Sequence, residues 1–379
     1  MLDQRYPALA DLKARARRRI PHFAWEYLDS GTGDELALRR SRTALDAVVL
    51  KPAILSGTVA KDLSTPLLGQ DFAFPFGIAP LGMSGLFWAG AEAHLARLAA
   101  RLHIPYGLST VAAAAPEDIA PHHGGMGWFQ LYPQSDAKIT ADILRRAWEA
   151  GFGTLILTVD VPGPSRRERQ RRGGVPTPPR LTPRVLWHAA QRPAWSLAMA
   201  RGGMPRLRTL EGYPEPPPST ADQGHVGLAA HSGPDWDFLD GLRELWPGKI
   251  VAKGVLVPED AVRLAEAGVD ALWVSNHGGR QFDGAPGSAE ALPLVRSSVG
   301  AEVPVIYDGA VASGLDVLKA IALGADFVML GRAWHWGLGA FGAKGAAHVA
   351  HILTEDMLAC MTQMGIARPI EARERLWPV

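Results

Sequence analysis

The stretch from Glu266 to Asp283, EAGVDALWVSNHGGRQFD, contains the pattern that decides the fold. A helical segment ends on Gly268, a residue type that closes helices by adopting a left-handed conformation. The apolar run from Val269 to Val274 follows, with the length and composition of a buried strand. It ends on polar residues, with His277 and Arg280 beside two glycines. The sequence therefore predicts a helix, a buried strand and a polar loop in direct succession.

The same succession recurs along the chain. Glu149-Ala150-Gly151-Phe152 and Ala322-Leu323-Gly324-Ala325-Asp326 also end a helical segment on glycine before an apolar run. The predicted strands are Phe76–Ala79, Ile104–Leu108, Trp128–Leu131, Thr154–Val159, Ile250–Ala252, Ala271–Val274, Val303–Tyr307 and Phe327–Leu330. Helices are expected at Ala91–Leu102, Ala137–Ala150, Pro258–Ala267 and Gly314–Leu323. Eight strands alternating with helices predict an α/β fold, a (β/α)8 TIM barrel.

Two segments fall outside this rhythm. Residues 1–70 read as a helical cap, with a helix around Ile20–Leu28 that carries Pro21 near its first turn. Residues 162–235 form a long insertion after the fourth strand, rich in Pro, Gly and Arg. We expect a single domain over residues 1–379, with the barrel in 75–160 and 249–345 and C-terminal helices in 346–379.

Composition narrows the classes of function. The chain has 379 residues, 47% hydrophobic and 20% charged, with a net charge of +1, so nothing global indicates nucleic acid binding. A single cysteine, Cys360, excludes an intrachain disulfide framework, a CxxC redox pair and a cysteine-rich zinc site. The first residues lack an apolar signal region, and no apolar run has the length of a membrane span. A cytoplasmic protein is expected.

The insertion has an unusual charge pattern. Between Glu168 and Glu211 there is no acidic residue, and Trp187, Trp195, Leu186, Leu197 and Met199 are interleaved with basic side chains. The arginines are Arg169, Arg171, Arg172, Arg180, Arg184, Arg192, Arg201, Arg206 and Arg208. Such a segment suits an anionic membrane surface, which residues 180–210 would contact. The segment is also typical of an active-site lid or a subunit contact, with arginine solvating its outer face, and this interpretation is slightly favoured.

Nearly every predicted strand ends on a polar residue, which a purely structural barrel does not need. Glycine-rich turns after strands seven and eight, with Arg332, match the usual phosphate site of such barrels. Ser109, Gln130 and Thr158 suit the polar edge of a flat heterocycle, and Lys253 suits a ring that becomes anionic on reduction. The groups left for a substrate are His277, Asp160, Arg280, Tyr132 and Arg167. Together they indicate a phosphate-bearing flavin with a hydroxy acid beside it, because imidazole can take a proton and guanidinium can hold a carboxylate.

From about Ile20 to the C-terminal region, the chain resembles the FMN-dependent 2-hydroxy-acid oxidase and dehydrogenase family, which includes glycolate oxidase, lactate oxidase and mandelate dehydrogenase. The motifs that carry the resemblance are Ile78-Ala79-Pro80, Trp128-Phe129-Gln130-Leu131-Tyr132, Leu157-Thr158-Val159-Asp160, Arg166-Arg167-Glu168, Ala252-Lys253-Gly254-Val255, Val274-Ser275-Asn276-His277-Gly278 with Arg280-Gln281, Asp308-Gly309 and Gly331-Arg332.

The resemblance implies a role for each matching residue. His277 would be the base, paired with Asp160, and Tyr132 would lie near the reacting hydroxyl. Arg280, Arg167 and Tyr27 would hold the substrate carboxylate. The FMN-binding residues would be Pro80, Leu81, Gly82, Ser109, Gln130, Thr158, Lys253, Ser275, Asp308, Gly309, Gly331 and Arg332. The implied reaction oxidises an L-2-hydroxy acid to the 2-oxo acid in a homo-oligomer, a tetramer in the family, and passes electrons to a quinone or another acceptor.

Four positions depart from the family pattern. Ala312 replaces an arginine of many members, which implies one phosphate or flavin contact fewer, and Leu81 replaces a threonine. Gly82 resembles mandelate dehydrogenase rather than the oxidases, and Val111 stands in place of a bulky tryptophan, which implies room for an aryl or other large side chain. The basic insertion falls where the mandelate dehydrogenase branch has a membrane-associating loop, so peripheral contact with the inner face of the membrane is expected.

Three alternatives stay open at this point. An oxidase on the same scaffold would pass electrons to oxygen and release hydrogen peroxide. A flavin-dependent isomerase or an inosinate-type nucleotide dehydrogenase would share the barrel, although the latter needs a cysteine in a barrel loop and Cys360 falls beyond the last strand. A non-catalytic flavoprotein would have to bury the His277, Asp160, Arg280 and Arg167 set without a substrate anion.

Overall fold

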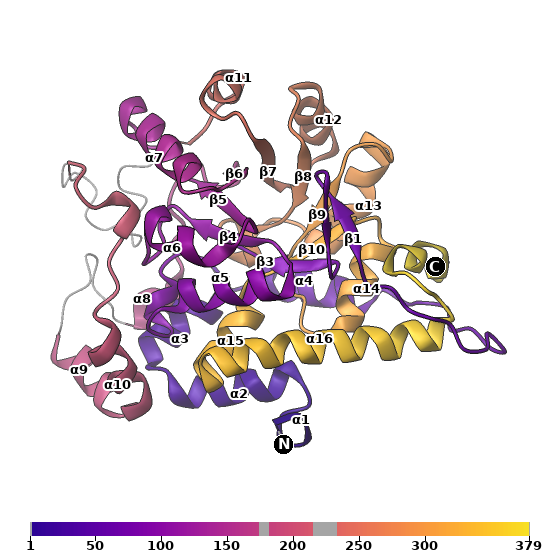
Figure 1. Cartoon of the computed structure of the whole chain (residues 1–379), viewed down its shortest axis with the longest axis horizontal. Helices are drawn as coiled ribbons and strands as arrows, with labels where there is room; N and C mark the ends of the chain where they lie inside the picture. The colour runs from indigo at the N-terminus through magenta and orange to yellow at the C-terminus, as the bar shows by residue number, and fades with distance from the viewer. Residues whose placement is uncertain (1, 174–181, 215–232, 379) are drawn as a thin grey trace.

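The computed structural model describes residues 2–173, 182–214 and 233–378, and its core is a closed barrel of eight parallel strands (Figure 1). Each strand pairs with its neighbour in chain order, and the last pairs with the first. The strands are β3 (Phe76–Ile78), β4 (Tyr106–Ser109), β5 (Gly127–Leu131), β6 (Thr154–Thr158), β7 (Lys249–Val255), β8 (Ala271–Val274), β9 (Val305–Tyr307) and β10 (Phe327–Leu330). The predicted TIM barrel is confirmed.

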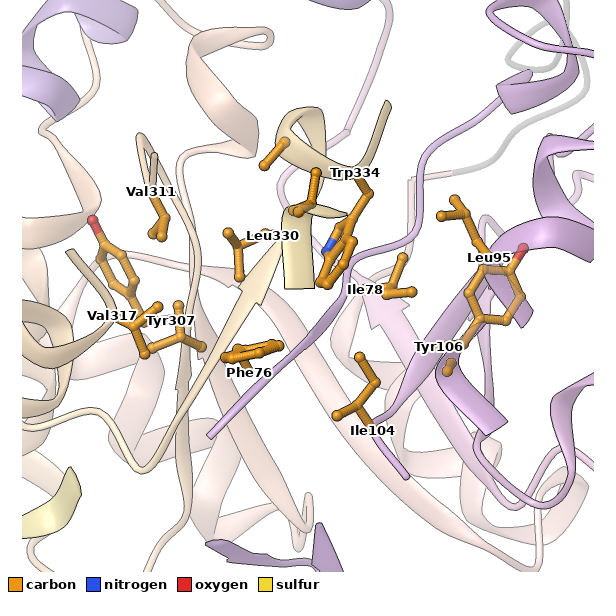
Figure 2. Close-up of a cluster of buried hydrophobic side chains, with 14 of the residues drawn as sticks. Phe76, Ile78, Leu95, Ile104, Tyr106, Tyr307, Val311, Val317, Leu330 and Trp334 are labelled. Atoms are coloured by element: carbon orange, nitrogen blue, oxygen red, sulfur yellow. The ribbon is translucent and has the colours of Figure 1, made fainter. Parts of the chain in front are cut away.

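Helices surround the strands because each strand has an outward-facing apolar side. Phe76, Ile78 and Leu330 lie in the core between strands and helices, where Trp334 packs beside them (Figure 2). The barrel helices are α5 (Ala91–Leu102), α6 (Pro116–His123), α7 (Ala137–Glu149), α11 (Trp236–Leu245), α12 (Pro258–Glu266), α13 (Ser288–Val299), α14 (Gly314–Ala322) and α15 (Arg332–Phe341). The long α16 (Ala343–Met364) and the 3-10 segment η5 (Pro369–Arg375) complete the chain.

The inward-facing residues form a second apolar core at one end of the barrel. Trp128, Ile156, Val251, Trp273 and Phe327 are among its members. Because side chains alternate between the two faces of a strand, the next inward position lies two residues further on. In three strands that position holds Gln130, Thr158 and Lys253. The strands therefore change from an apolar to a polar interior toward their C-terminal ends.

A hairpin closes the apolar end of the barrel. Its strands are β1 (Thr65–Leu67) and β2 (Gln70–Phe72), and Phe72 packs edge-on against Phe327 at a centroid distance of 5.5 Å. Residues 1–70 were expected to form a helical cap, and the first strand of this hairpin, which that expectation did not include, falls inside the range. The turn residues Leu68 and Gly69 have φ of +54° and +81°, the left-handed conformations that a tight hairpin turn requires.

Helices of the N-terminal cap come before the hairpin. They are α1 (Leu2–Arg5), α2 (Leu9–Arg19), α3 (His22–Asp29) and α4 (Leu36–Asp46). Helix α2 packs against α15, and α4 packs against η4 (His277–Gly279), the loop after β8. The cap therefore reaches the mouth of the barrel where the strands end.

The insertion after β6 carries α8 (Glu168–Gly173), α9 (Pro183–Ala190), α10 (Pro193–Gly202) and η2 (Arg208–Leu210). Its apolar residues divide into two groups. Trp195 and Met199 are buried, and Trp195 Nε1 donates a hydrogen bond of 3.0 Å to the carbonyl of Leu86, whereas Leu186, Trp187 and Leu197 are exposed. Arg180 lies outside the described residues. One face of the insertion thus docks on the barrel and the other faces solvent.

Candidate active site

The polar ends of the strands surround a cavity of about 470 Å³ at the C-terminal mouth of the barrel. Most residues expected at the site line it: Tyr27, Pro80, Leu81, Gly82, Ser109, Gln130, Tyr132, Thr158, Arg167, Lys253, His277, Arg280, Asp308, Gly309, Gly331 and Arg332. Asp160 and Ser275 contact that lining from behind, through His277 and Lys253. The structure therefore brings the whole expected set together.

Several loops around this cavity have a strained backbone. His277, Arg167, Ala310 and Met83 all have φ between +45° and +57°, although none is glycine. They follow four different strands, β8, β6, β9 and β3. Left-handed conformations of such residues persist only where the surroundings hold them, and they cluster at functional sites.

The His277 imidazole is held by Asp160. Its Nδ1 lies 3.0 Å from Asp160 Oδ1, and its Nε2 lies 3.4 Å from the Tyr132 hydroxyl. Burial lowers the pKa of His277 below its ordinary value, more than the attraction of Asp160 raises it. Burial alone would raise the pKa of Asp160, yet the charge of His277 and its hydrogen bond hold that pKa below its ordinary value. The pair fits a neutral imidazole with its proton on Nδ1 and a free electron pair on Nε2 that faces the cavity.

A glycine makes room for Asp160. Gly254 lies at an irregularity in the pairing of β7 with β8, and its φ is +109°. A Cβ atom at this position would lie 2.4 Å from Asp160 Cγ. The bulge in β7 therefore provides the space in which the carboxylate reaches the imidazole.

Two guanidinium groups line the same cavity as the imidazole. Arg167 Nη2 donates to Gln281 Oε1 at 2.9 Å, and Arg280 Nη1 donates to the carbonyl of Tyr27 at 2.6 Å. Burial lowers the pKa of Arg280 well below its ordinary value, and the nearby charges of Arg167 and Arg332 lower it further. Arginine stays charged in proteins, so this direction marks a buried cation without a compensating anion.

The polar groups below the cavity form two chains of hydrogen bonds. In the first, Ser109 Oγ donates to Gln130 Oε1 at 2.6 Å, and Gln130 Nε2 donates to Thr158 Oγ1 at 3.0 Å. In the second, Lys253 Nζ donates to Ser275 Oγ at 3.0 Å, and Ser275 Oγ donates to Asp308 Oδ1 at 2.6 Å. Their remaining donors and acceptors suit the heteroatom edge of a flavin ring, with the Lys253 cation at one end.

The start of α15, another part of the cavity lining, suits a phosphate group. Gly331 precedes α15, so free backbone N–H groups begin there, and Arg332 is the first residue of the helix. The Arg332 guanidinium donates to the carbonyls of Leu28, Ser30 and Gly278 at 3.0 to 3.2 Å. Among the described residues, no carboxylate lies within ion-pair distance of Arg332, Arg280 or Arg167. This donor set fits FMN, with an anion completing the charge of Arg332.

Ala312 leaves the loop after β9 without an arginine of its own. A cation from the cap reaches the same loop: Arg42 Nη1 donates to the carbonyl of Ala310 at 2.8 Å and also binds Asp316. Asp316 in turn accepts from the backbone N–H of Ala312 at 2.8 Å. The loop is therefore ordered by the cap, although no cationic side chain of its own points into the cavity.

Sequence reasoning missed the residues that hold the catalytic candidates in place. Asn276 links the β8 loop to the cap, because its Nδ2 donates to Ser41 Oγ at 2.8 Å. Ser165 Oγ accepts from Arg167 Nε at 3.0 Å. These residues belong to or border the recognised motifs, but serine and asparagine in loops carry no chemical signature of a positioning role.

A buried histidine also lies below the mouth. His335 Nε2 is 2.7 Å from Ser84 Oγ, and His335 Nδ1 is 2.9 Å from the carbonyl of Gly331. The pair joins the loop after β3 to the first turn of α15. Burial lowers the pKa of His335 to about 4, so the ring is neutral at physiological pH.

Comparisons with known proteins agree with this geometry. The sequence profile described as FMN-dependent dehydrogenase matches residues 16–377. An L-lactate dehydrogenase of Pectobacterium atrosepticum is 38% identical over 362 residues, which cover 94% of this chain and 93% of that protein. One of Pseudomonas aeruginosa is 37% identical and covers 94% of each chain. Among solved structures, a monotopic membrane protein, (S)-mandelate dehydrogenase, superposes with a TM-score of 0.90 at 32% identity over 98% of both chains, and a mandelate oxidase with 0.82 at 33% over 98% of both.

Proposed function

The chain belongs to the FMN-dependent dehydrogenase family, and from that membership we propose that it oxidises an L-2-hydroxy acid to the corresponding 2-oxo acid. One observation carries the proposal: the His277 imidazole lines the same cavity as two guanidinium groups, the buried Arg167 and the half-buried Arg280, that have no carboxylate partner among the described residues. A substrate with a hydroxyl and a carboxylate needs a base for the hydroxyl proton and cations for the carboxylate, and these groups supply both.

The chemistry assigned to His277 is proton removal. Its Nε2 accepts the hydroxyl proton of the substrate, and the charge that then develops on the ring is stabilised by Asp160 at Nδ1. Tyr132 lies 3.4 Å from the same Nε2. Because burial raises the pKa of its phenol, the hydroxyl stays protonated and can donate a hydrogen bond to the substrate oxygen. Bound FMN supplies the two-electron acceptor for the oxidation.

Arg167 and Arg280 are assigned to the substrate carboxylate, with the hydroxyl of Tyr27. The Arg280 guanidinium lies 5.4 Å from the centre of the Tyr27 ring, so the cation and the phenol share one side of the cavity. Because this side is closed by the cap and the insertion, water has little access, and each charge-assisted hydrogen bond is stronger than it would be in solvent.

Anaerobic mixing of the FMN-loaded protein with L-lactate and L-mandelate tests this function directly. We expect loss of the visible absorbance of oxidised flavin with at least one of them and none with the D-enantiomers. Flavin that no L-2-hydroxy acid reduces would contradict the proposal.

We further propose that the preferred substrate has a bulky apolar side chain. Val111 forms a small buried cluster with Tyr132 and Val161, against which Leu207 of the insertion packs. This cluster borders the cavity and offers apolar surface for a ring. Values of kcat/KM measured for L-lactate, L-2-hydroxy-4-methylpentanoate and L-mandelate should rise along that series, and a maximum at L-lactate would refute this preference.

The electrons are proposed to pass to an acceptor other than oxygen. Gly82 lies against Val111, and the glycine at this position is the feature that differs from the oxidases named in the resemblance. Admitting air to the reduced protein separates the two classes. We expect slow reoxidation and fast reaction with a quinone; rapid peroxide formation would establish the oxidase alternative.

The exposed side of the insertion is proposed to contact an anionic membrane surface. Trp187 of α9 and Leu197 of α10 are 64% and 52% exposed, and Arg184 and Arg201 lie on the same helices. Of the described part of the chain, no helix combines the length and apolarity that crossing a bilayer needs. The contact would therefore be peripheral.

Vesicle sedimentation tests this contact. Binding to phosphatidylglycerol vesicles and its loss in a Trp187→Ser, Leu197→Ser double variant are expected, whereas Ile54→Ser with Leu55→Ser, on an exposed loop elsewhere, should leave binding unchanged. Equal binding by all three proteins would place the contact elsewhere.

The tetramer implied by the family stays a prediction, for which light scattering after size exclusion is the measurement.

A further inference from the structure

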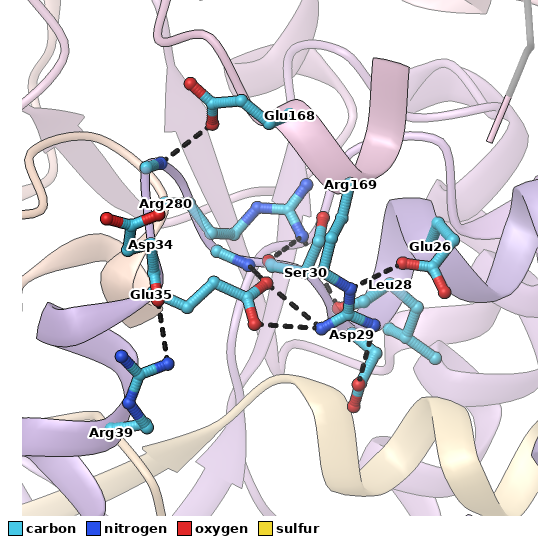
Figure 3. Close-up of polar contacts among 12 residues, drawn as sticks. Glu26, Leu28, Asp29, Ser30, Asp34, Glu35, Arg39, Glu168, Arg169 and Arg280 are labelled. Atoms are coloured by element: carbon cyan, nitrogen blue, oxygen red, sulfur yellow. Dashed lines mark hydrogen bonds and ion pairs between the residues drawn. The ribbon is translucent and has the colours of Figure 1, made fainter. Parts of the chain in front are cut away.

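Arg169 is the most highly paired cation at the mouth of the barrel, and it belongs to the first turn of α8, two residues after Arg167 (Figure 3). Its Nε donates to Glu26 Oε2 at 2.7 Å, and its Nη1 lies 3.0 Å from both oxygens of Glu35. Its Nη2 lies 3.4 Å from Asp29 Oδ2. Three carboxylates of the cap thus converge on one guanidinium of the insertion.

The residues beside Arg169 also bind the cap. Glu168 Oε2 accepts from the backbone N–H of Gly33 at 2.8 Å, and the backbone N–H of Arg167 donates to Thr32 Oγ1 at 3.3 Å. Three consecutive residues of the insertion are therefore attached to the segment between Glu26 and Glu35. Figure 3 shows Glu168 and Arg169 of the insertion directed toward the cap residues Glu26, Asp29 and Glu35.

This attachment coincides with a strained residue. Arg167 has a φ of +45°, a conformation that costs about 1–3 kcal/mol for a residue other than glycine. On the cavity side, its side chain is held by Ser165 and Gln281, which are neutral. Ion pairs between this backbone segment and the cap run through Arg169, whereas the other ion pair here, between Arg166 and Glu168 at 3.5 Å, stays within the insertion.

We propose that Arg169 is a positioning residue: together with Glu26, Asp29 and Glu35 it forms a latch that holds Arg167 in its strained conformation over the substrate carboxylate. This inference rests on the proposed function, because it assumes that Arg167 binds that carboxylate. We call these four residues the cap latch. It couples the attachment of residues 167–169 to the cap to the affinity for substrate rather than to the chemical step.

Charge explains why Arg169 is decisive in the cap latch. The three carboxylates are largely buried, with side-chain exposures of 9%, 15% and 17% for Glu26, Asp29 and Glu35. Lys13 neutralises part of the charge of Asp29 at 2.9 Å. Loss of Arg169 would leave three like charges of the cap close together in a poorly solvated place, and the attraction that holds the insertion on the cap would be lost.

The test compares three variants of the FMN-loaded protein. Arg169→Gln removes the cation, Arg169→Lys keeps the charge but loses the fork of donors, and Arg166→Gln is the matched control. Arg166 lies on the same segment but its side chain is 80% exposed, and its ion pair among the described residues is with Glu168, at 3.5 Å. For each protein, steady-state kinetics with an L-2-hydroxy acid are paired with hydrogen–deuterium exchange of residues 32–36 and 165–169.

We expect Arg169→Gln to raise KM about tenfold or more with less than a threefold change in kcat, because carboxylate binding is shared by ground state and transition state. Backbone exchange at Gly33 and Arg167 should become faster. Arg169→Lys should fall between this variant and the wild type, and Arg166→Gln should match the wild type in both measurements.

Other outcomes overturn the inference. Unchanged exchange in Arg169→Gln means that no latch exists, and faster exchange with unchanged KM means that the contacts are merely structural. A fall in kcat alone places Arg169 in the chemical step. If Arg169→Gln fails to fold, the KM and the exchange of Arg169→Lys decide in its place. If no L-2-hydroxy acid reduces the flavin of the wild-type protein, the proposed function is refuted. The exchange data then show independently whether the latch exists.

Discussion

The two mouths of the barrel are built from the same strands in opposite ways. In β7, Val251 points into the apolar core below, and Lys253, two residues later, points into the cavity above. The lower mouth is filled by Phe72 and its aromatic neighbours. The upper mouth holds three unpaired guanidinium groups among the described residues and four strained non-glycine residues. One strand thus contributes to stability at one end and to chemistry at the other.

The difference shows which end of the barrel stabilises the fold and which end destabilises it. Burial of aromatic surface in the lower mouth stabilises the fold by several kcal/mol. Buried unpaired cations and left-handed residues in the upper mouth each cost about 1–3 kcal/mol until substrate and cofactor arrive. Substitutions in the two mouths should therefore separate activity from stability.

The largest effect is expected at His277. His277→Gln keeps a hydrogen-bonding side chain but removes the base, so the rate of flavin reduction should fall about a thousandfold while FMN remains bound. Stopped-flow absorbance gives the rate, and the flavin spectrum gives the occupancy. A near wild-type rate in this variant would show that another group takes the proton, and the assignment of His277 as the base would be wrong.

Phe72→Ala, at the lower mouth, should have the opposite effect: a loss of stability without a loss of activity. Removal of this fully buried ring should lower the free energy of unfolding by about 3–5 kcal/mol and leave kcat/KM of the folded enzyme within a factor of two. Denaturant unfolding and initial rates are the two measurements. Leu55→Ala, at a fully exposed position, serves as the control for stability. A large loss of kcat/KM would show that the mouths are not independent.

His335, at the upper mouth, should make the free energy of unfolding depend on pH. Its pKa in the folded protein is about 4, below the ordinary value of about 6.5. Protonation therefore favours unfolding: the stabilisation is complete above pH 6.5, declines as the pH falls toward 4, and totals about 3 kcal/mol. The difference in unfolding free energy between wild type and His335→Phe, measured from pH 7 to 4, isolates this contribution from the carboxylates that both proteins share. A difference that does not vary with pH would contradict the prediction.

The smallest effect tests the packing beside the cavity. In Gly82→Ala the new methyl would lie 2.6 Å from Val111 Cγ2, so Val111 must shift and stability should fall by about 1 kcal/mol. The double variant with Val111→Ala relieves this contact and should recover most of the loss. Thermal unfolding of the single and double variants measures both effects. If the stability losses of the two substitutions simply add, the new methyl and Val111 do not touch.

Much of this architecture could be predicted from the sequence because barrel strands and helix ends have strong local patterns. The eight apolar runs and the glycines that end helices, such as Gly268, depend on neighbouring residues only. The site followed from one further rule, that functional groups lie where strands end. His277 and Asp160, 117 positions apart, met because both follow strands of the same barrel.

The parts that could not be predicted depend on contacts between distant segments. The hairpin turn at Leu68 was missed because leucine rarely adopts a positive φ. The insertion could not be divided into buried and exposed sides, since Trp195 and Trp187 look alike in the sequence and only the docking on Leu86 distinguishes them. The latch at Arg169 pairs residues about 140 positions apart, and no local pattern shows which acid meets which base.

The bulge at Gly254 has a consequence for attempts to transplant this chemistry. A designer who grafts a histidine and an aspartate onto the strand ends of another barrel would copy the two side chains and their loops. The aspartate would then collide with a regular neighbouring strand, because the space it uses here exists only where the adjacent backbone bends and lacks a side chain. The minimal portable unit is therefore three strands wide, and its third member is a residue with no chemistry of its own.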